Sequence, residues 1–148
     1  MSYSRFIAMI ATSVVAMYIL MYLNTYSFAH VYWSQTRAWM ALYMGAVMAL
    51  IMLGYMLAMY RNRAANIAIL VVGVVVFSGS LYLLRSQNTV DDVAWMRAMI
   101  PHHSIAILTS ERANITDPRV RELADAIIAT QLREIDEMEM LIEDLNAP

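Results

Sequence analysis

Three long uncharged stretches constrain this chain more than any other feature of its sequence. No Asp, Glu, Lys or Arg occurs between Arg5 and Arg37, from residue 38 to 60, or from residue 64 to 84. Each stretch is long enough to cross a hydrocarbon layer of about 30 Å as a helix. With 61% hydrophobic and 15% charged residues, the chain has the composition of a membrane protein. We expect a membrane domain over residues 1–86, with transmembrane helices at about 6–28, 38–60 and 67–84.

The first stretch resembles a secretory signal peptide only in part. It is longer than the apolar core of such a peptide, and it ends in YSFAHVYW without a clear small-residue cleavage site. We therefore expect it to remain as a membrane anchor. The aromatic side chains near its end, Tyr26, Tyr32, Trp33 and Trp39, are typical of the belt that contacts lipid at a membrane surface.

The arginines predict the orientation of the membrane domain. The second connection, RNRAAN, carries Arg61 and Arg63, and Arg5 lies on the same side, whereas the first connection carries only Arg37. Positively charged connections tend to remain in the cytoplasm. We therefore expect a multi-pass protein of the inner (cytoplasmic) membrane, with a cytoplasmic N-terminus and an extracytoplasmic, periplasmic C-terminal domain. The absence of cysteine is consistent with an oxidising compartment.

The acidic residues are confined to the C-terminal part of the chain. All twelve lie from Asp91 onward, so this part carries a net negative charge. Such a charge repels the phosphates of nucleic acids, and nucleic acid is not an expected partner. The charge is compatible with attraction of cations, although a solvated helical face is its commoner meaning.

This C-terminal part is expected to fold as an antiparallel helical hairpin over residues 90–146. Thr89 is followed three residues later by Asp92, which resembles a capping box. The first helix should therefore begin near Val90 and run to about Ala113. The predicted fold class is all-α: three transmembrane helices followed by an extracytoplasmic hairpin.

A second helix should follow the sequence NITDP. Asp117 is a suitable N-cap and Pro118 a suitable first helical residue, so this helix is expected to run from Pro118 to about Leu145. Residues at alternating steps of four and three then define one face, which is typical of a helix that packs on another. Gln131 and Glu134 interrupt this face, and buried carboxylates are rare unless they are paired or bound. The expected face comprises Val120, Ala124, Ile127, Gln131, Glu134, Met138, Leu141 and Leu145.

The stretch AWMRAMIPHHSIAIL gathers metal-ligating side chains on the first helix of the hairpin. Met96, Met99 and His103 share roughly one helical face, and His102 follows Met99 by three residues. Pro101 lacks a backbone N–H, and a kink there could turn both imidazoles toward one centre. Thioether and imidazole ligands favour Cu(I), whereas zinc more usually recruits thiolates, imidazoles or carboxylates. The alternative is that the methionines only fill a core.

An antiparallel hairpin would bring the polar interruption of the second helix to this group. With a turn at residues 114–117, Met99 should lie near Gln131 and Glu134, and Met96 near Glu134 and Met138. The predicted metal site therefore comprises His102, His103, Met99, Met138, Glu134, Met96 and Gln131.

The same two segments resemble the DUF305 family. MIPHHSIAI followed by DPRVRELADAIIATQLREIDEM matches the hallmarks M-x-P-H-H and Q-x-x-E-I-x-x-M of that family, over about residues 90–145. The resemblance implies a ferritin-like helical bundle and an association of some members with copper binding and tolerance. The positions that match the pattern are Met99, His102, His103, Gln131, Glu134 and Met138.

The expected function is that of a membrane-anchored protein that binds copper, preferably Cu(I), for tolerance, storage or delivery. Zinc and iron are expected less. The chain has no cysteine nucleophile, glycine-rich phosphate loop or HExxH pattern, and it lacks the Glu-x-x-His pairs of a ferritin-like di-iron centre. We therefore expect no enzymatic activity. The alternative is an accessory subunit of a larger membrane complex, with a hairpin that docks without metal.

Two helices of this length cannot enclose a core by themselves, and small domains need a partner or a covalent or metal staple. We therefore expect the hairpin to pair with a second copy into a four-helix bundle, or to pack on another subunit.

Methionines also recur in the second transmembrane stretch, at residues 40, 44, 48, 52 and 56. Such a ladder could pass Cu(I), with His30 and Met40 receiving the metal. The favoured interpretation is a packing stripe in an apolar helix and an interfacial histidine.

Overall fold

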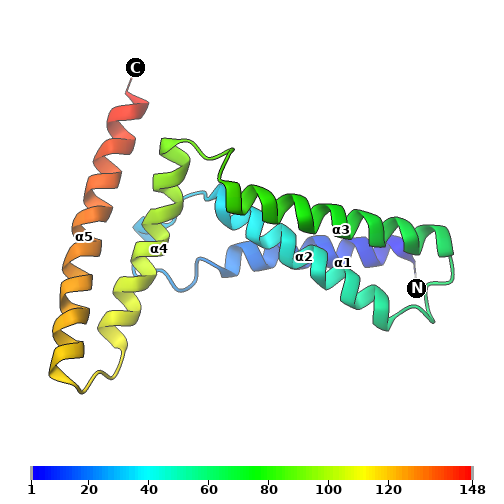
Figure 1. Cartoon of the computed structure of the whole chain (residues 1–148), viewed down its shortest axis with the longest axis horizontal. Coiled ribbons are helices and arrows are strands. Elements are labelled where there is room, and N and C mark those ends of the chain that lie inside the picture. Colours follow the sequence, from blue (N-terminus) through cyan, green and yellow to red (C-terminus); the bar gives the residue numbers. More distant parts are fainter. Residues whose placement is uncertain (1, 148) are drawn as a thin grey trace. The chain divides into compact units, whose positions relative to one another are not determined.

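The computed structural model describes residues 2–147, and within that range it contains five α-helices, one short 3₁₀ helix and no strand. The chain divides into two compact units, of which the first combines residues 2–21 with 36–89 and the second combines residues 22–35 with 90–147. The elements are α1 (Tyr3–Leu20), η1 (Phe28–His30), α2 (Gln35–Tyr55), α3 (Arg63–Ser86), α4 (Asp92–Arg112) and α5 (Pro118–Asn146) (Figure 1).

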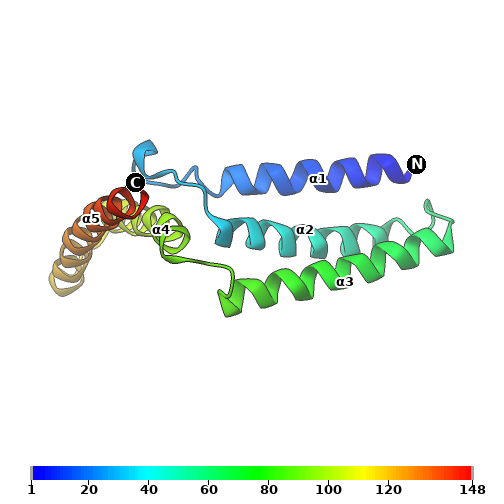
Figure 2. The same cartoon turned by 90° about the horizontal axis from the view of Figure 1, so that it is seen from above.

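In the first unit, α1, α2 and α3 lie side by side (Figures 1 and 2). All three are long and apolar enough to cross a membrane, which confirms the expectation of three membrane-length helices. Their bounds are shifted, because α2 begins and ends earlier than predicted and α3 is longer at both ends. The largest error is at the end of α1, which stops at Leu20 instead of near Phe28. The uncharged stretch continues past Leu20, but residues 22–35 leave the helix and join the second unit.

A cluster of buried side chains joins the helices of the first unit. Phe6, Leu53 and Tyr60 form its centre, and Met52 and Met56 pack against it. These two methionines of the α2 stripe therefore contribute to packing between helices, as the favoured interpretation of the stripe expects.

A glycine allows α1 and α2 to approach closely. A Cβ atom added at Gly45 would meet the Val14 side chain of α1, whereas one added at Gly54, on the same helix, would meet nothing within 4 Å. Small residues at helix contacts are typical of membrane proteins, where close backbone approach increases van der Waals packing.

In the second unit, α4 and α5 run in opposite directions and pack side by side (Figures 1 and 2). Their ends are close to the predicted ones. Asp117 caps α5, with Pro118 in its first turn, as expected. The cap of α4 was predicted wrongly: Asp91, not Thr89, accepts a hydrogen bond from the Ala94 N–H at 2.7 Å. The α4–α5 pair is the frame on which the candidate site is built.

The core of the α4–α5 pair differs in part from the predicted face of α5. Two expected residues, Ala124 and Met138, are buried, but the apolar residues at 120, 127, 141 and 145 are exposed. The reason is that α5 carries two apolar stripes, about 80° apart around the helix, and only one of them faces α4. The core cluster consists of Met96, Ile100, Ile107, Ile135, Met138 and Ile142, with Val93, Met99, Ile128 and Tyr32 packed against it.

The 22–35 segment, which connects α1 to α2, packs against α4. Ser104 of α4 is fully buried, and its Oγ accepts a hydrogen bond from the Tyr26 N–H at 2.7 Å. The same Oγ lies 2.9 Å from Nδ1 of His30, which can accept the serine proton. The segment was expected to belong to the membrane domain, whereas the structure places it in the unit that contains the two histidines of the motif.

Candidate metal site

His103 joins the two helices of the α4–α5 pair. Its Nε2 lies 2.9 Å from Oε2 of Glu134 on α5, and its Nδ1 lies 3.0 Å from the carbonyl oxygen of Met99, one turn earlier on α4. The two ring nitrogens of His103 thus contact both helices, and the tautomer decides which of them donates its proton. The side chain links α4 to α5 in a half-buried position.

The contact between His103 and Glu134 fixes how the two helices align. Because they are antiparallel, Met99, one turn before His103, lies level with Met138, one turn after Glu134. One turn corresponds to about 5.4 Å along a helix. The predicted alignment, with Met99 beside Gln131 and Glu134, was wrong by about one turn. It matched positions at equal distances from a turn at residues 114–117, whereas the observed contact pairs residue 103 with residue 134.

The three methionines of the predicted site meet in the core of the pair. Met96 and Met138 are buried in the core cluster, and Met99 packs against it. The thioethers therefore belong to the layer next to His103 and Glu134, where they also fill the core. The structure therefore brings together five of the predicted residues: His103 contacts Glu134, and Met96, Met99 and Met138 meet in the adjacent core.

His102 and Gln131 have different surroundings. His102 is exposed, and the centroid of its ring lies 6.2 Å from that of the His103 ring. Successive residues of a helix point about 100° apart, so the two imidazoles diverge even with Pro101 inside the helix. Gln131 is half-buried one turn before Glu134, on the side away from Met138.

The donor set of one chain is too small for a metal that prefers imidazole and carboxylate ligands. Within residues 2–147, no three His, Cys, Asp or Glu side chains are grouped closely enough to hold a metal ion. The described site offers one imidazole and one carboxylate, and the remaining nearby donors are thioethers. Such a set suits a soft cation, for which thioethers are good ligands.

Sequence reasoning missed the residues that hold the 22–35 segment. Besides the bonds to Ser104, the Tyr32 hydroxyl donates to Oε1 of Glu139 on α5 at 3.2 Å. Burial raises the pKa of the Tyr32 phenol, and the neighbouring Glu139 carboxylate raises it further. Ser104 was detectable in principle: it lies three residues before Ile107 and four after Ile100, on the apolar face of α4, where a buried hydroxyl needs partners.

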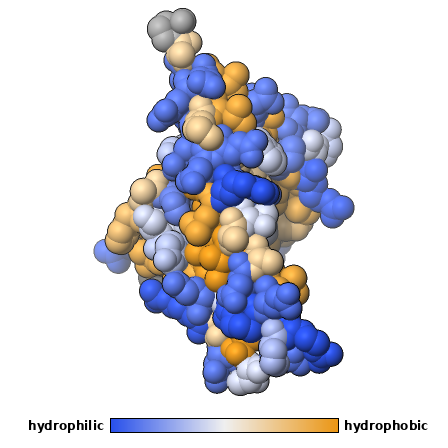
Figure 3. All heavy atoms as spheres, turned by 90° about the vertical axis from the view of Figure 1, so that its left-hand side faces the viewer, coloured by the Kyte–Doolittle hydropathy of each residue, from blue (hydrophilic) through white to orange (hydrophobic). Residues whose placement is uncertain are grey.

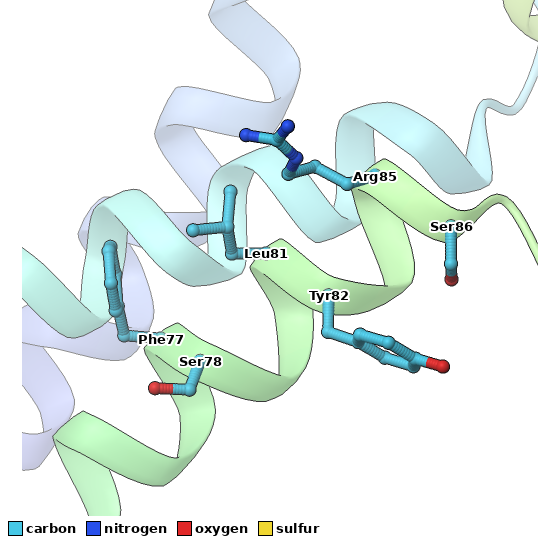
Figure 4. A pocket seen from close by; sticks show the side chains of 6 residues that line it. All are labelled: Phe77, Ser78, Leu81, Tyr82, Arg85 and Ser86. Carbon is cyan, nitrogen blue, oxygen red and sulfur yellow. The ribbon is translucent and has the colours of Figure 1, made fainter.

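A separate hollow of about 480 Å³ lies on the first unit (Figure 4). It is open, and all of its lining side chains come from α3: Phe77, Ser78, Leu81, Tyr82, Arg85 and Ser86. Arg85 is the one charged group among them, and no metal-ligating set accompanies it. The hollow therefore adds no second metal site.

Fold and site together define an all-helical protein in which three membrane-length helices accompany a helix pair joined by a histidine and a glutamate. The DUF305 family, described as a domain of unknown function, matches residues 85–148. An uncharacterized protein of Acanthamoeba polyphaga mimivirus is 32% identical over 145 residues, and the similarity covers 93% of each chain. The chain therefore belongs to the DUF305 family. No solved structure matches it at a significant level.

Proposed function

We propose that this DUF305 protein is a membrane-anchored, extracytoplasmic binder of copper, held as Cu(I) for tolerance, storage or delivery. The observation that carries the proposal is the layered donor set, with His103 beside Glu134 in one layer and Met99 beside Met138 in the next. Imidazole nitrogen and thioether sulfur are both good ligands for Cu(I).

The contact between His103 and Glu134 supports cation binding. A cation on Nε2 of His103 would lie beside the Glu134 carboxylate, whose negative charge stabilises it, and it would displace any proton on that nitrogen. The contact between Nδ1 and the Met99 carbonyl oxygen would hold the imidazole ring in place while the cation binds. Protons compete with the metal, and binding should weaken as the pH falls.

The other predicted residues take subsidiary roles in this proposal. His102 is exposed and suits a first contact for an arriving ion, whereas Met96 is buried and suits a reserve thioether. Gln131 would orient Glu134 or the ion from the opposite side. Zinc and iron are less favoured in one chain, because it offers too few imidazole and carboxylate ligands there.

The proposed location follows from the chain path and the arginines. The 22–35 segment and residues 90–147 belong to one unit, and two membrane-length helices, α2 and α3, separate them along the chain. Two crossings return a chain to its starting side, which supports a membrane-spanning role for both helices. Arg61 and Arg63 support a cytoplasmic second connection, with the second unit outside.

The test is Cu(I) affinity of the purified full chain in detergent, measured by competition with a coloured Cu(I) chelator. His103→Ala should weaken binding at least about tenfold, and Met99→Leu with Met138→Leu should do the same while nearly preserving core volume. Met140→Leu is the matched control, because Met140 lies on α5 but is exposed and outside the site. Unchanged affinity in folded His103→Ala would overturn the copper proposal and favour the accessory-subunit alternative.

A further inference from the structure

Within residues 2–147, no other helix covers the second apolar stripe of α5. It consists of Val120, Leu123, Ile127, Leu141 and Leu145, which are 49%, 60%, 36%, 45% and 58% exposed, with Glu134 at its middle. The apolar residues form two groups, one toward each end of α5, with the polar residues Gln131 and Glu134 between them. Exposed apolar residues at helical spacing usually mark an interface. Figure 3, which turns the left-hand side of Figure 1 toward the viewer, shows apolar surface between strongly hydrophilic groups.

The spacing of the stripe is symmetric about Glu134. Ile127 and Leu141 each lie seven residues from Glu134, and Leu123 and Leu145 each lie eleven residues from it. If a second α5 runs antiparallel about a two-fold axis at Glu134, Ile127 faces the partner's Leu141 and Leu123 faces the partner's Leu145. A two-fold interface needs such self-complementarity, and a parallel pairing would not use it.

The same face of the α4–α5 pair carries His103. His103 contacts Glu134 at the edge of this stripe, whereas Ser104, about 100° further round α4, is covered by the 22–35 segment. The segment therefore blocks one side of α4 and leaves the side with His103 open. A partner on the stripe would bring its own α4 beside this open side and complete four helices.

We propose that a second copy of this chain docks on the α5 stripe about a two-fold axis at Glu134, and that the two His103–Glu134 pairs then form one site for a divalent cation. Because His103 lies level with Glu134, the axis brings both imidazoles and both carboxylates into one layer. The combined set has two nitrogen and two oxygen donors, which suits Zn²⁺. One chain supplies only half of it.

Electrostatic repulsion explains why docking of the second copy should depend on cation binding. Two carboxylates that meet inside an apolar interface repel each other unless positive charge accompanies them. A divalent cation supplies that charge, and the ligand spacing needs little change: nitrogen and oxygen lie 2.9 Å apart in the present contact and about 3.4 Å apart in a tetrahedral zinc site. At the rim, the exposed Arg133 lies within one turn of the partner's Glu137, where opposite charges attract.

This inference shares His103 with the proposed copper site but uses different accompanying donors. The copper site depends on the thioethers of Met99 and Met138, whereas the interface site depends on Glu134 and on the stripe. The double change Met99→Leu with Met138→Leu should therefore weaken copper binding and leave the Zn²⁺-dependent pairing intact. The two proposals can fail separately.

The first experiment measures the molar mass of the full chain in detergent by light scattering, with EDTA or with Zn²⁺. Zn²⁺ should convert monomer to dimer, with one zinc per two chains, and Glu134→Gln should weaken this effect at least about tenfold. Leu141→Lys should prevent the dimer, whereas Leu132→Lys should not, because Leu132 is similarly exposed at 42% but lies outside the stripe. A molar mass that does not change when Zn²⁺ is added, or the same molar mass for the two lysine variants with Zn²⁺, would overturn the proposal.

The second experiment tests the antiparallel alignment. Because the chain contains no cysteine, any disulfide must form between the introduced residues. Oxidation of the Ile127→Cys, Leu141→Cys double variant should link two chains with Zn²⁺ present. Ile127→Cys alone should not link, because the two identical positions would lie about 21 Å apart along the helices, beyond the reach of a disulfide. Efficient linking of the single variant would indicate a parallel pair and contradict the proposal.

Discussion

At the scale of single residues, Ser104 has as large a structural role as the histidines beside it. His103 faces α5, and Ser104 faces the 22–35 segment, so two consecutive residues join α4 to its two neighbours. Both connections depend on polar atoms within an otherwise apolar core. Loss of one partner in such a place leaves the other partner without a hydrogen bond, which costs more than the bond itself contributed.

We predict that Ser104→Ala destabilises the second unit. The Tyr26 N–H and Nδ1 of His30 both lose their partner, at a cost of about 1–3 kcal/mol. Hydrogen exchange of the 22–35 amides, measured in detergent, should become faster. Thr109→Ala is the control, because the Thr109 hydroxyl is exposed and donates only to carbonyls of its own helix. Equal exchange in the two variants would show that Ser104 does not hold the segment.

Part of the candidate site could be predicted from residue types alone. Histidine, glutamate and methionine in this pattern indicated that α4 and α5 would meet at them, and His103 does meet Glu134. The orientation of His102 could not be derived, because a proline inside a helix does not by itself specify where the next side chains point. The partners of Ser104 lie 74 and 78 residues away in the sequence, and no local pattern relates them.

At the scale of helices, the sequence predicted the ends of a helix well only where a capping residue and a proline mark them, and it predicted the buried face of α5 poorly. The bounds of α5 were predicted to within one residue, because a cap and a proline act on their own neighbours. The end of α1 was missed by about eight residues, since an uncharged sequence does not reveal where a chain leaves a helix. The buried side of α5 was missed because both of its stripes are apolar, and packing against α4 selects between them.

We predict that Gly45→Ala destabilises the first unit, whereas Gly54→Ala on the same helix does not. The added methyl group at Gly45 would meet Val14, whose branched side chain has little rotational freedom. Overpacking of this kind costs about 1–3 kcal/mol. Gly54 has open space around it, and alanine favours a helix more than glycine does. Thermal unfolding in detergent should separate the two variants, and identical midpoints would contradict the close contact.

At the scale of the whole molecule, the chain path restricts the topology. The 22–35 segment and the C-terminal helices form one unit, so they must lie on the same side of any membrane that α2 and α3 cross. Under the proposed orientation, the arginines keep the second connection in the cytoplasm and place both segments on the other side. The chain path therefore predicts that the two segments share one side of the membrane, and the arginines predict which side that is.

We predict that cysteines placed at Asn24 and Asn146 react with a membrane-impermeant maleimide on intact cells, whereas a cysteine at Ala58 reacts only after permeabilisation. All three positions are exposed, so protection would report the membrane and not burial. Different accessibility at 24 and 146 would contradict the shared side. Reactivity only at 58 would keep the shared side and reverse the orientation.

The position of the 22–35 segment in the sequence also determines when this segment can pack during synthesis. Ser104 is synthesised 78 residues after Tyr26, the residue whose N–H it accepts. At a translation rate of about 5–20 residues per second, the segment waits about 4–16 s on the nascent chain before its covering helix exists. A chain that terminated after α3 would keep the segment uncovered, because it would lack α4. Closure of this segment against α4 is therefore an event that only a chain containing both intervening helices can complete.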